Sequence, residues 1–226
     1  MCGRFALVTE KHILEMLYDM ELRADFDLQP RYNIAPSQDV PGLRLAPKGS
    51  GKELVELKWG LVPFWADDES IGNRMINARA ETAAEKPVFR DAFKKRRLLV
   101  PVTGFYEWKK EGNSKRPYYI YRRDNRPFSL AGLWERWKRG SKSLETFTIL
   151  TTEPNELVAT LHNRMPVIIH SADYQRWLDP ATITEDLLSL LTPYSADEFA
   201  ARPVSRLVNN PANDFPELLE KISSKD

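Results

Sequence analysis

The feature that most constrains the fold is the way prolines and glycines punctuate the chain. The 226 residues include 16 prolines and 10 glycines, which recur along the sequence. Between them lie short segments of alternating or periodic hydrophobicity, with no internal repeat and no low-complexity linker. This pattern is not that of regular strand–helix–strand units. It predicts one compact domain, 1–226, that mixes short strands with short helices.

Strand patterns outnumber helical ones. Alternating apolar residues predict strands over 40–46, 54–59, 98–102, 104–109, 118–122, 130–134 and 146–151, with turns at 48–52 and 111–114. Apolar spacing of three and four residues predicts helices over 11–20, 87–97, 155–162, 173–178 and 184–191. Thr9 is the expected N-cap of the first helix, and Pro87 is expected to open the second, basic helix. We therefore expect an α+β fold with a curled, mainly antiparallel sheet and peripheral helices.

Charge is distributed unevenly along the chain. The net charge is only +1, yet residues 71–140 hold 18 Lys and Arg against 7 Asp and Glu, while both flanking thirds are acidic. A basic segment of this kind favours a polyanion such as DNA as the partner. Alternatively, the basic third pairs with the acidic thirds inside the fold, and no basic patch results. Charge alone does not separate the two readings.

Several classes of protein are disfavoured by composition. The chain has no apolar run of membrane-spanning length and no basic-then-apolar leader, so we expect no membrane partner and a cytoplasmic, nucleoid-associated protein. One cysteine and the three histidines His12, His162 and His170 are too few and too scattered for a zinc site. We expect neither a metal nor another cofactor.

The single cysteine, Cys2, directly follows the initiator methionine. If Met1 is removed, as is usual before a small residue, Cys2 carries an α-amine and a thiol on adjacent carbons. The amine condenses with an aldehyde to an imine, and the thiol then closes a five-membered thiazolidine. The ordinary pKa of an α-amine, about 7.7–8.0, leaves a useful fraction unprotonated near neutral pH. The plainer alternatives are a small buried hydrophobe or an exposed residue at a frayed end.

Four polar residues lie in apolar or turn-rich settings that packing does not explain: Asn33, Asn77, Glu107 and His162. A carboxylate between Tyr106 and Trp108 would be desolvated, which suits general acid–base work, unless strand alternation turns Glu107 to water. His162 is a candidate proton shuttle or a helix-end histidine. Asn77 is a candidate ligand for an amine or hydroxyl, or a turn residue.

Aromatic side chains interleaved with arginines are a second candidate for DNA contact, because they stack on bases. Most of the six tryptophans are expected in the core, where aromatics dominate burial. Trp65 is the best candidate for exposure, because it follows Pro63 and precedes an acidic loop.

The chain resembles the SRAP (SOS response-associated peptidase) family, whose members act on abasic sites in DNA. Six blocks carry the resemblance, in family order: Met-Cys-Gly-Arg-Phe at 1–5, Arg-Tyr-Asn-Ile-Ala-Pro at 31–36, Trp-Gly-Leu-Val-Pro at 59–63, Ile-Asn-Ala-Arg-Ala-Glu-Thr at 76–82, Gly-Phe-Tyr-Glu-Trp at 104–108 and His-Asn-Arg-Met-Pro at 162–166. The strings at 131–134 and 203–205 also match. The resemblance therefore covers a core of about residues 2–208, and nothing is inferred for the tail of 209–226.

The resemblance implies a pseudo-barrel sheet with a DNA groove, and a covalent cross-link between the N-terminal cysteine and abasic sites in single-stranded DNA. The thiazolidine would shield the site from strand cleavage. The implied catalytic residues are Cys2, Asn77, Glu107 and His162. The implied phosphate contacts are Arg4, Arg79 and Arg164, and the positions lining the site or the bases are Asn33, Pro36, Trp65 and Thr151. Some members carry a second tryptophan where this chain has Ala66, which weakens the case for base stacking there.

Two other classes of function remain open. A Cys/His hydrolase would use Cys2, His162 and an orienting partner such as Asn77, and the family is also assigned peptidase and lyase-type chemistry. A non-catalytic binder of single-stranded DNA would use the arginines and aromatics alone. For the cross-linking function we expect a monomer whose partner is single-stranded DNA containing abasic sites, with the replication machinery as a candidate protein partner.

Overall fold

Two antiparallel-rich sheets form the body of the molecule. The computed structural model of the protein describes residues 2–46 and 51–222. The first sheet is antiparallel and has the strand order β13–β8–β7–β1–β2. Its strands are β1 Phe5–Leu7, β2 Arg31–Ile34, β7 Gly104–Glu111, β8 Ser114–Arg122 and β13 Phe199–Pro203.

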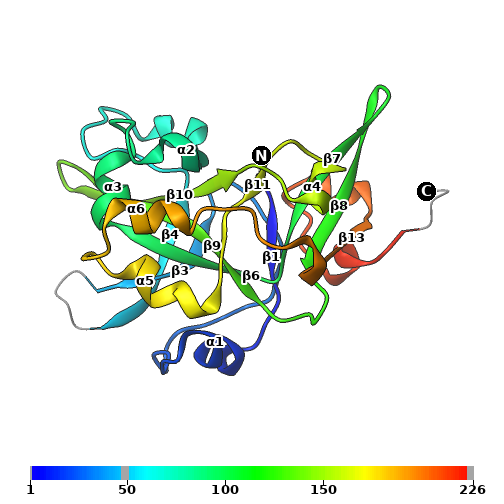
Figure 1. The fold of residues 1–226 in the computed structure, drawn as a ribbon, viewed down its shortest axis with the longest axis horizontal. Helices are drawn as coiled ribbons and strands as arrows, with labels where there is room; N and C mark the ends of the chain where they lie inside the picture. The colour runs from blue at the N-terminus through cyan, green and yellow to red at the C-terminus, as the bar shows by residue number, and fades with distance from the viewer. Residues whose placement is uncertain (1, 47–50, 223–226) are drawn as a thin grey trace.

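The second sheet curls into a closed ring (Figure 1). Its order is β11–β10–β4–β3–β6–β9–β12, and a further pairing of β9 with β10 closes β10, β4, β3, β6 and β9 on themselves. The strands are β3 Asp39–Leu45, β4 Lys52–Trp59, β6 Arg97–Val102, β9 Phe128–Arg139, β10 Lys142–Thr152, β11 Met165–Pro166 and β12 Ile168–Ile169. β5 Asn77–Arg79 pairs in parallel with β10. The α+β fold with a curled, mainly antiparallel sheet is confirmed.

Helices are short and lie outside the sheets (Figure 1). They are α1 Lys11–Tyr18, α2 Ala80–Ala83, α3 Arg90–Lys95, α4 Glu156–Ala159, α5 Tyr174–Leu178 and α6 Thr184–Ser189. Short 3-10 turns occupy Glu69–Arg74, Ser171–Asp173, Ala196–Glu198, Arg206–Asn209 and Pro216–Leu219. No helix among the described residues is long and apolar enough to cross a membrane.

Several helix boundaries differ from the expectation, and the helix expected over 155–162 covers only α4, Glu156–Ala159. The N-cap of α1 is Glu10 rather than Thr9, and it makes no side-chain cap hydrogen bond. The predicted helix over 87–97 is only α3, which starts three residues after Pro87 and stops before Arg97. Arg97 is buried and donates hydrogen bonds to the carbonyls of Trp177 and Asp179, so it begins β6 instead of ending a helix. The predicted hairpin of β3 and β4 is confirmed, while most of its turn, 47–50, lies outside the described residues.

The core has three main parts. One apolar cluster lies between the two sheets and includes Phe5, Trp59, Phe105 and Phe147. A second joins the ring to α1, α3, α5 and α6, and a third covers the other face of the first sheet with the segment after β13. Each large side chain buried in this way contributes about 1.5–3 kcal/mol relative to exposure. The first cluster fixes β1 against the ring, and with it the N-terminal residues.

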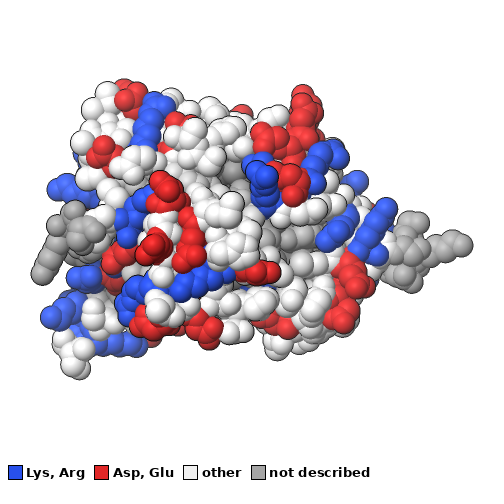
Figure 2. All heavy atoms as spheres, turned by 90° about the horizontal axis from the view of Figure 1, so that it is seen from below, with Lys and Arg blue, Asp and Glu red and all other residues white. Residues whose placement is uncertain are grey.

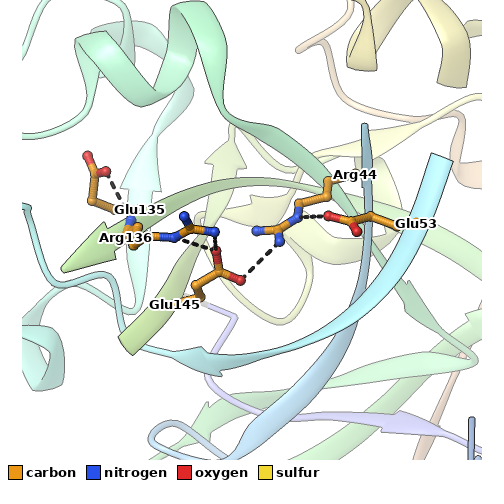
Figure 3. Close-up of polar contacts among 5 residues, drawn as sticks. All are labelled: Arg44, Glu53, Glu135, Arg136 and Glu145. Atoms are coloured by element: carbon orange, nitrogen blue, oxygen red, sulfur yellow. Dashed lines mark hydrogen bonds and ion pairs between the residues drawn. The ribbon is translucent and has the colours of Figure 1, made fainter. Parts of the chain in front are cut away.

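Charged groups pair across the ring strands (Figure 3). Arg44 on β3 contacts Glu53 on β4 at 2.7 Å and Glu145 on β10 at 3.0 Å, and Glu145 also accepts from Arg136 on β9. The Arg44 guanidinium stacks over the Trp134 ring at 4.1 Å. These contacts tie strands from the acidic and the basic thirds of the chain together.

The basic middle third is neutralised in part by the flanking thirds. Arg122 pairs with Glu198, Arg136 with Glu145, and Arg139 with Asp67. Figure 2 shows the molecule from the side on which α1 lies. On this face cationic and anionic side chains are interspersed, and no large patch carries charge of a single sign. Internal pairing, the second reading of the charge pattern, therefore accounts for some of the basic excess.

Candidate functional site

Cys2 is buried, contrary to the expectation for a residue near a chain end. Its exposure is 0%, and it belongs to the apolar cluster between the sheets that also holds Phe5 and Trp59, whose tilted rings have centroids 5.0 Å apart. Burial raises the pKa of the Cys2 thiol far above its ordinary value, and the charge of Glu107 adds to this. A backbone hydrogen bond from Arg4 acts in the opposite direction but is smaller. The resting thiol is therefore protonated at neutral pH.

Glu107 lies on β7 and points inward. Strand alternation would have placed it in water, but its exposure is 2% and Tyr106 beside it is also buried, on the opposite face of the sheet. Burial raises the pKa of the Glu107 carboxyl, and the charge of His162 lowers it in part. The side chains of Cys2, Glu107 and His162 thus interact electrostatically in one site, although they come from three distant parts of the sequence.

His162 follows α4 and is held by backbone. Its N–H donates to the carbonyl of Val158 at 2.8 Å. The ring atom Nδ1 lies 3.0 Å from the backbone nitrogen of Arg164 and 3.2 Å from the carbonyl oxygen of the same residue. Nδ1 accepts from the Arg164 N–H in one tautomer and donates to the Arg164 carbonyl in the other, so the same backbone holds the ring in both.

Asn77 opens β5, where it is in register with Ile149 of β10. It is a strand residue and not the turn residue of the plainer reading. Its Nδ2 donates to the carbonyl of Ile76 at 2.8 Å, while its Oδ1 is buried with no hydrogen-bond partner among the described residues. A buried acceptor left unpaired is costly, so Oδ1 is prepared to accept from a donor such as an amine.

Of the three arginines assigned to phosphate, Arg79 is the exposed one, at the N-terminal end of α2. Arg4 donates to Asn33 Oδ1 at 2.7 Å and to the carbonyl of Val208, and burial lowers its pKa. The Arg164 side chain is 15% exposed, and its guanidinium forms a two-point ion pair with Glu81. Its Nη2 also donates to the carbonyl of Thr151, a buried residue.

Asn33 is 1% exposed and faces the C-terminal segment. Its Nδ2 donates to the carbonyls of Val208, Asn210 and Asn213. The backbone N–H groups of Tyr32 and Asn33 in turn donate to Asp214. Asn33 thus joins β2 and Arg4 to residues 208–214, a contact absent from the sequence interpretation.

Pro36 and Trp65 both lie in turns between strands. Pro36 is half-buried after β2. Trp65 is 49% exposed, as predicted, and lines a surface pocket of about 450 Å³ with Ala66, Asp67, Asp68, Ser70, Ile71, Asn73 and Arg74. Ala66 is buried, and its carbonyl accepts a hydrogen bond from Trp137. The aromatic surface at this position therefore comes from Trp65 and the neighbouring exposed Phe64.

Sequence reasoning gave no role to Glu81 or to the segment after 208. Glu81 lies inside the block 76–82, two residues after Arg79, and a carboxylate so close to an arginine is the sequence feature that could have pointed to it. Among residues 2–46 and 51–222, no group of three or more His, Cys, Asp or Glu side chains is arranged to hold a metal ion.

Comparisons with known proteins agree on one family. The family model described as SOS response associated peptidase (SRAP) matches residues 1–211. The chain is 45% identical to "Abasic site processing protein YoqW" of Bacillus subtilis over 97% of this chain and 99% of the relative. It is 31% identical to "Abasic site processing protein YedK" of Escherichia coli over 98% and 100%. A crystal structure of a Bacteroides thetaiotaomicron protein superposes with a TM-score of 0.87 at 29% identity, over 98% of this chain and all of that one.

Proposed function

Because the chain belongs to the SOS response associated peptidase (SRAP) family, we propose that it processes abasic sites in DNA as part of a DNA damage response. Relatives at 45% and 31% identity over nearly the full chain carry the name abasic site processing protein. The observation that carries the proposal is the convergence of the buried Cys2 and Glu107 with the half-buried His162. An aldehyde is the electrophile that such an N-terminal cysteine traps.

The reaction begins when removal of Met1 frees the α-amine of Cys2. An abasic deoxyribose equilibrates between a closed hemiacetal and an open aldehyde, and a carboxyl with a raised pKa is suited to move the proton that opens the ring. The amine adds to C1′ and water leaves, which gives an imine. Asn77 Oδ1 is the acceptor that would orient the amine.

The second step closes the ring. The Cys2 sulfur bonds to the imine carbon, and the thiol proton passes to the nitrogen, so the thiazolidine forms without further loss of atoms. Thiol and imine belong to one residue, and effective molarities for such steps reach about 10⁵ M or more. The thiazolidine lacks the imine that promotes β-elimination, and the DNA strand is therefore protected. His162 handles the proton when the ring reopens.

DNA contact is assigned to the surface around this site. Arg79 is the exposed arginine and the first candidate for a phosphate, while the Trp65 face offers a platform for a base. Arg4 is half-buried and holds its neighbours through the hydrogen bonds described above. Single-stranded DNA is the proposed substrate because an abasic sugar must leave the helix to reach a buried cysteine.

The experiment is an adduct assay. The purified protein is incubated with single-stranded DNA bearing an abasic site, then resolved by denaturing gel and intact mass. The expected product has the mass of protein plus DNA minus one water. The Cys2→Ala variant is expected to lose the stable adduct while still binding DNA, and a retained Met1 is expected to block the reaction. Absence of any adduct with wild-type protein would refute the cross-link.

The hydrolase alternative is less well supported by the geometry. A Cys–His–Asn arrangement uses the asparagine to orient the histidine, whereas the ring atom Nδ1 of His162 is held by the backbone of Arg164. Peptide cleavage that survives an N-terminal extension would favour the hydrolase over the aldehyde trap.

A further inference from the structure

The backbone of Arg164 presents two groups to one ring nitrogen of His162. The N–H lies 3.0 Å from Nδ1 and the carbonyl oxygen lies 3.2 Å from it. When Nδ1 is unprotonated it accepts from the N–H, and when it is protonated it donates to the carbonyl. Both protonation states of Nδ1 therefore find a partner without movement of the ring. This holds only while the Arg164 backbone stays in place.

The side chain of Arg164 anchors that backbone. Nη1 and Nη2 contact the two carboxylate oxygens of Glu81 at 2.6 and 2.8 Å, and Nη2 also donates to the carbonyl of Thr151. Thr151 is paired with Arg79 on β5 and with Pro166 on β11, so Arg164 lies where three strands and α2 meet. Two-point pairs between arginine and carboxylate fix geometry as well as charge.

We infer that Glu81 is a positioning residue, which holds Arg164 so that the Arg164 backbone keeps the His162 ring in place for proton transfer. This inference rests on the proposed function and adds a specific role to it. It also gives Arg164 a task other than phosphate contact, because its Nη1–Nη2 edge faces Glu81. A phosphate would reach that edge only by displacing the Glu81 carboxylate.

Reversal of the cross-link tests the inference. Glu81→Ala is expected to slow reversal by about tenfold or more, because small misplacements of a reacting group are costly. Glu81→Gln, which still accepts from Arg164, is expected to restore most of the rate. Affinity for single-stranded DNA carrying a tetrahydrofuran in place of the abasic sugar, which cannot form the adduct, is expected to change little in either variant.

Glu85→Ala is the matched control. Glu85 is an exposed carboxylate four residues along the same segment, so its substitution removes the same charge. If Glu81→Ala instead tightens binding to the tetrahydrofuran DNA and leaves reversal unchanged, Glu81 competes with phosphate and the inference is wrong. Unchanged reversal and unchanged binding together would equally overturn it.

An NMR readout does not depend on the cross-link. The imidazole signals of His162 in the free protein are expected to shift in Glu81→Ala and to return in Glu81→Gln, while those of His12 and His170 stay fixed. If wild-type protein forms no adduct, the proposed function fails, but this spectrum still tests whether Glu81 holds His162. An unshifted His162 spectrum in Glu81→Ala would overturn the inference on its own.

Discussion

At the scale of single residues, the site depends on how burial controls proton positions. The Cys2 thiol is fully buried and burial raises its pKa, so little thiolate exists at neutral pH. Because the thiolate is the nucleophile, we expect iodoacetamide to alkylate Cys2 in the folded protein at least about tenfold more slowly than in denaturant. The chain has one cysteine, so intact mass reports this site alone. Equal rates in both conditions would show that the thiol is accessible and ionised.

Glu107 is expected to cost stability where it is ionised. Burial raises the pKa of its carboxyl in the folded protein. The contribution of Glu107 to stability is therefore fully present below its unfolded pKa and is lost as the pH rises through its folded pKa. Each unit of difference between the folded and the unfolded pKa is worth about 1.4 kcal/mol. At pH 8, Glu107→Gln should have a larger free energy of unfolding than wild type, and the difference should be smaller at pH 4. Urea denaturation at the two pH values measures this. A constant difference across pH would contradict this.

The same substitution should cost activity. A positioned acid–base group contributes about 10²–10⁴-fold, so Glu107→Gln is expected to slow adduct formation by about 10²-fold. Residue type and setting made Cys2, Glu107 and His162 candidates but left a plainer reading open for each, and only the family resemblance implied their roles. The choice between a buried and an exposed Cys2 or Glu107 depends on contacts between the first residues, β7 and the loop after α4, and no local pattern encodes those contacts.

At the scale of elements, the apolar pattern predicted the long strands of both sheets but not the short ones. The long strands β3, β4, β6, β7, β8, β9 and β10 overlap the predicted ranges, since each carries an alternating or continuous apolar run of several residues. β1, β2, β5, β11, β12 and β13 have two to five residues, which is too short for a period to stand out. α3 ended early because tertiary hydrogen bonds to Arg97 outweighed helical propensity.

The charged contacts across the ring give a prediction for the stability of these elements. Arg44 is 4% exposed, pairs with Glu53 and Glu145, and stacks on the Trp134 ring. Removal of its guanidinium leaves the two carboxylates without this positive partner. Because both carboxylates keep some contact with solvent, Arg44→Met is expected to lower the free energy of unfolding by about 1–3 kcal/mol. Arg23→Met, at an exposed pair with Asp25, is the control and should cause no measurable change. A cost at Arg23 equal to that at Arg44 would contradict the argument.

At the scale of the whole molecule, the C-terminal segment is packed against the first sheet and tied to β2. Leu218 is fully buried in the cluster over the first sheet, and Asn33 and Asp214 tie residues 208–214 to β2. Large buried side chains cost about 2–5 kcal/mol when truncated to alanine. Leu218→Ala should therefore lower the free energy of unfolding by about that amount, whereas Leu207→Ala, at a side chain that is 55% exposed, should change it little. Equal effects would mean that the segment is not part of the core.

The net charge of +1 and the internal ion pairs limit the number of cationic groups available to phosphates, and so limit the salt dependence of the proposed DNA binding. Part of the basic third is paired with acidic side chains, so we expect few phosphate contacts, centred on Arg79, which is in register with Thr151 of β10. Each contact to a single strand contributes about 0.7 to the slope of log affinity against log salt. Arg79→Ala should reduce the slope by about that amount, measured by anisotropy on tetrahydrofuran DNA. Arg126→Ala, beside the α1 residues Ile13 and Met16, is the control that removes equal charge on another face. An equal loss in both variants would mean that net charge, and not a located contact, holds the DNA.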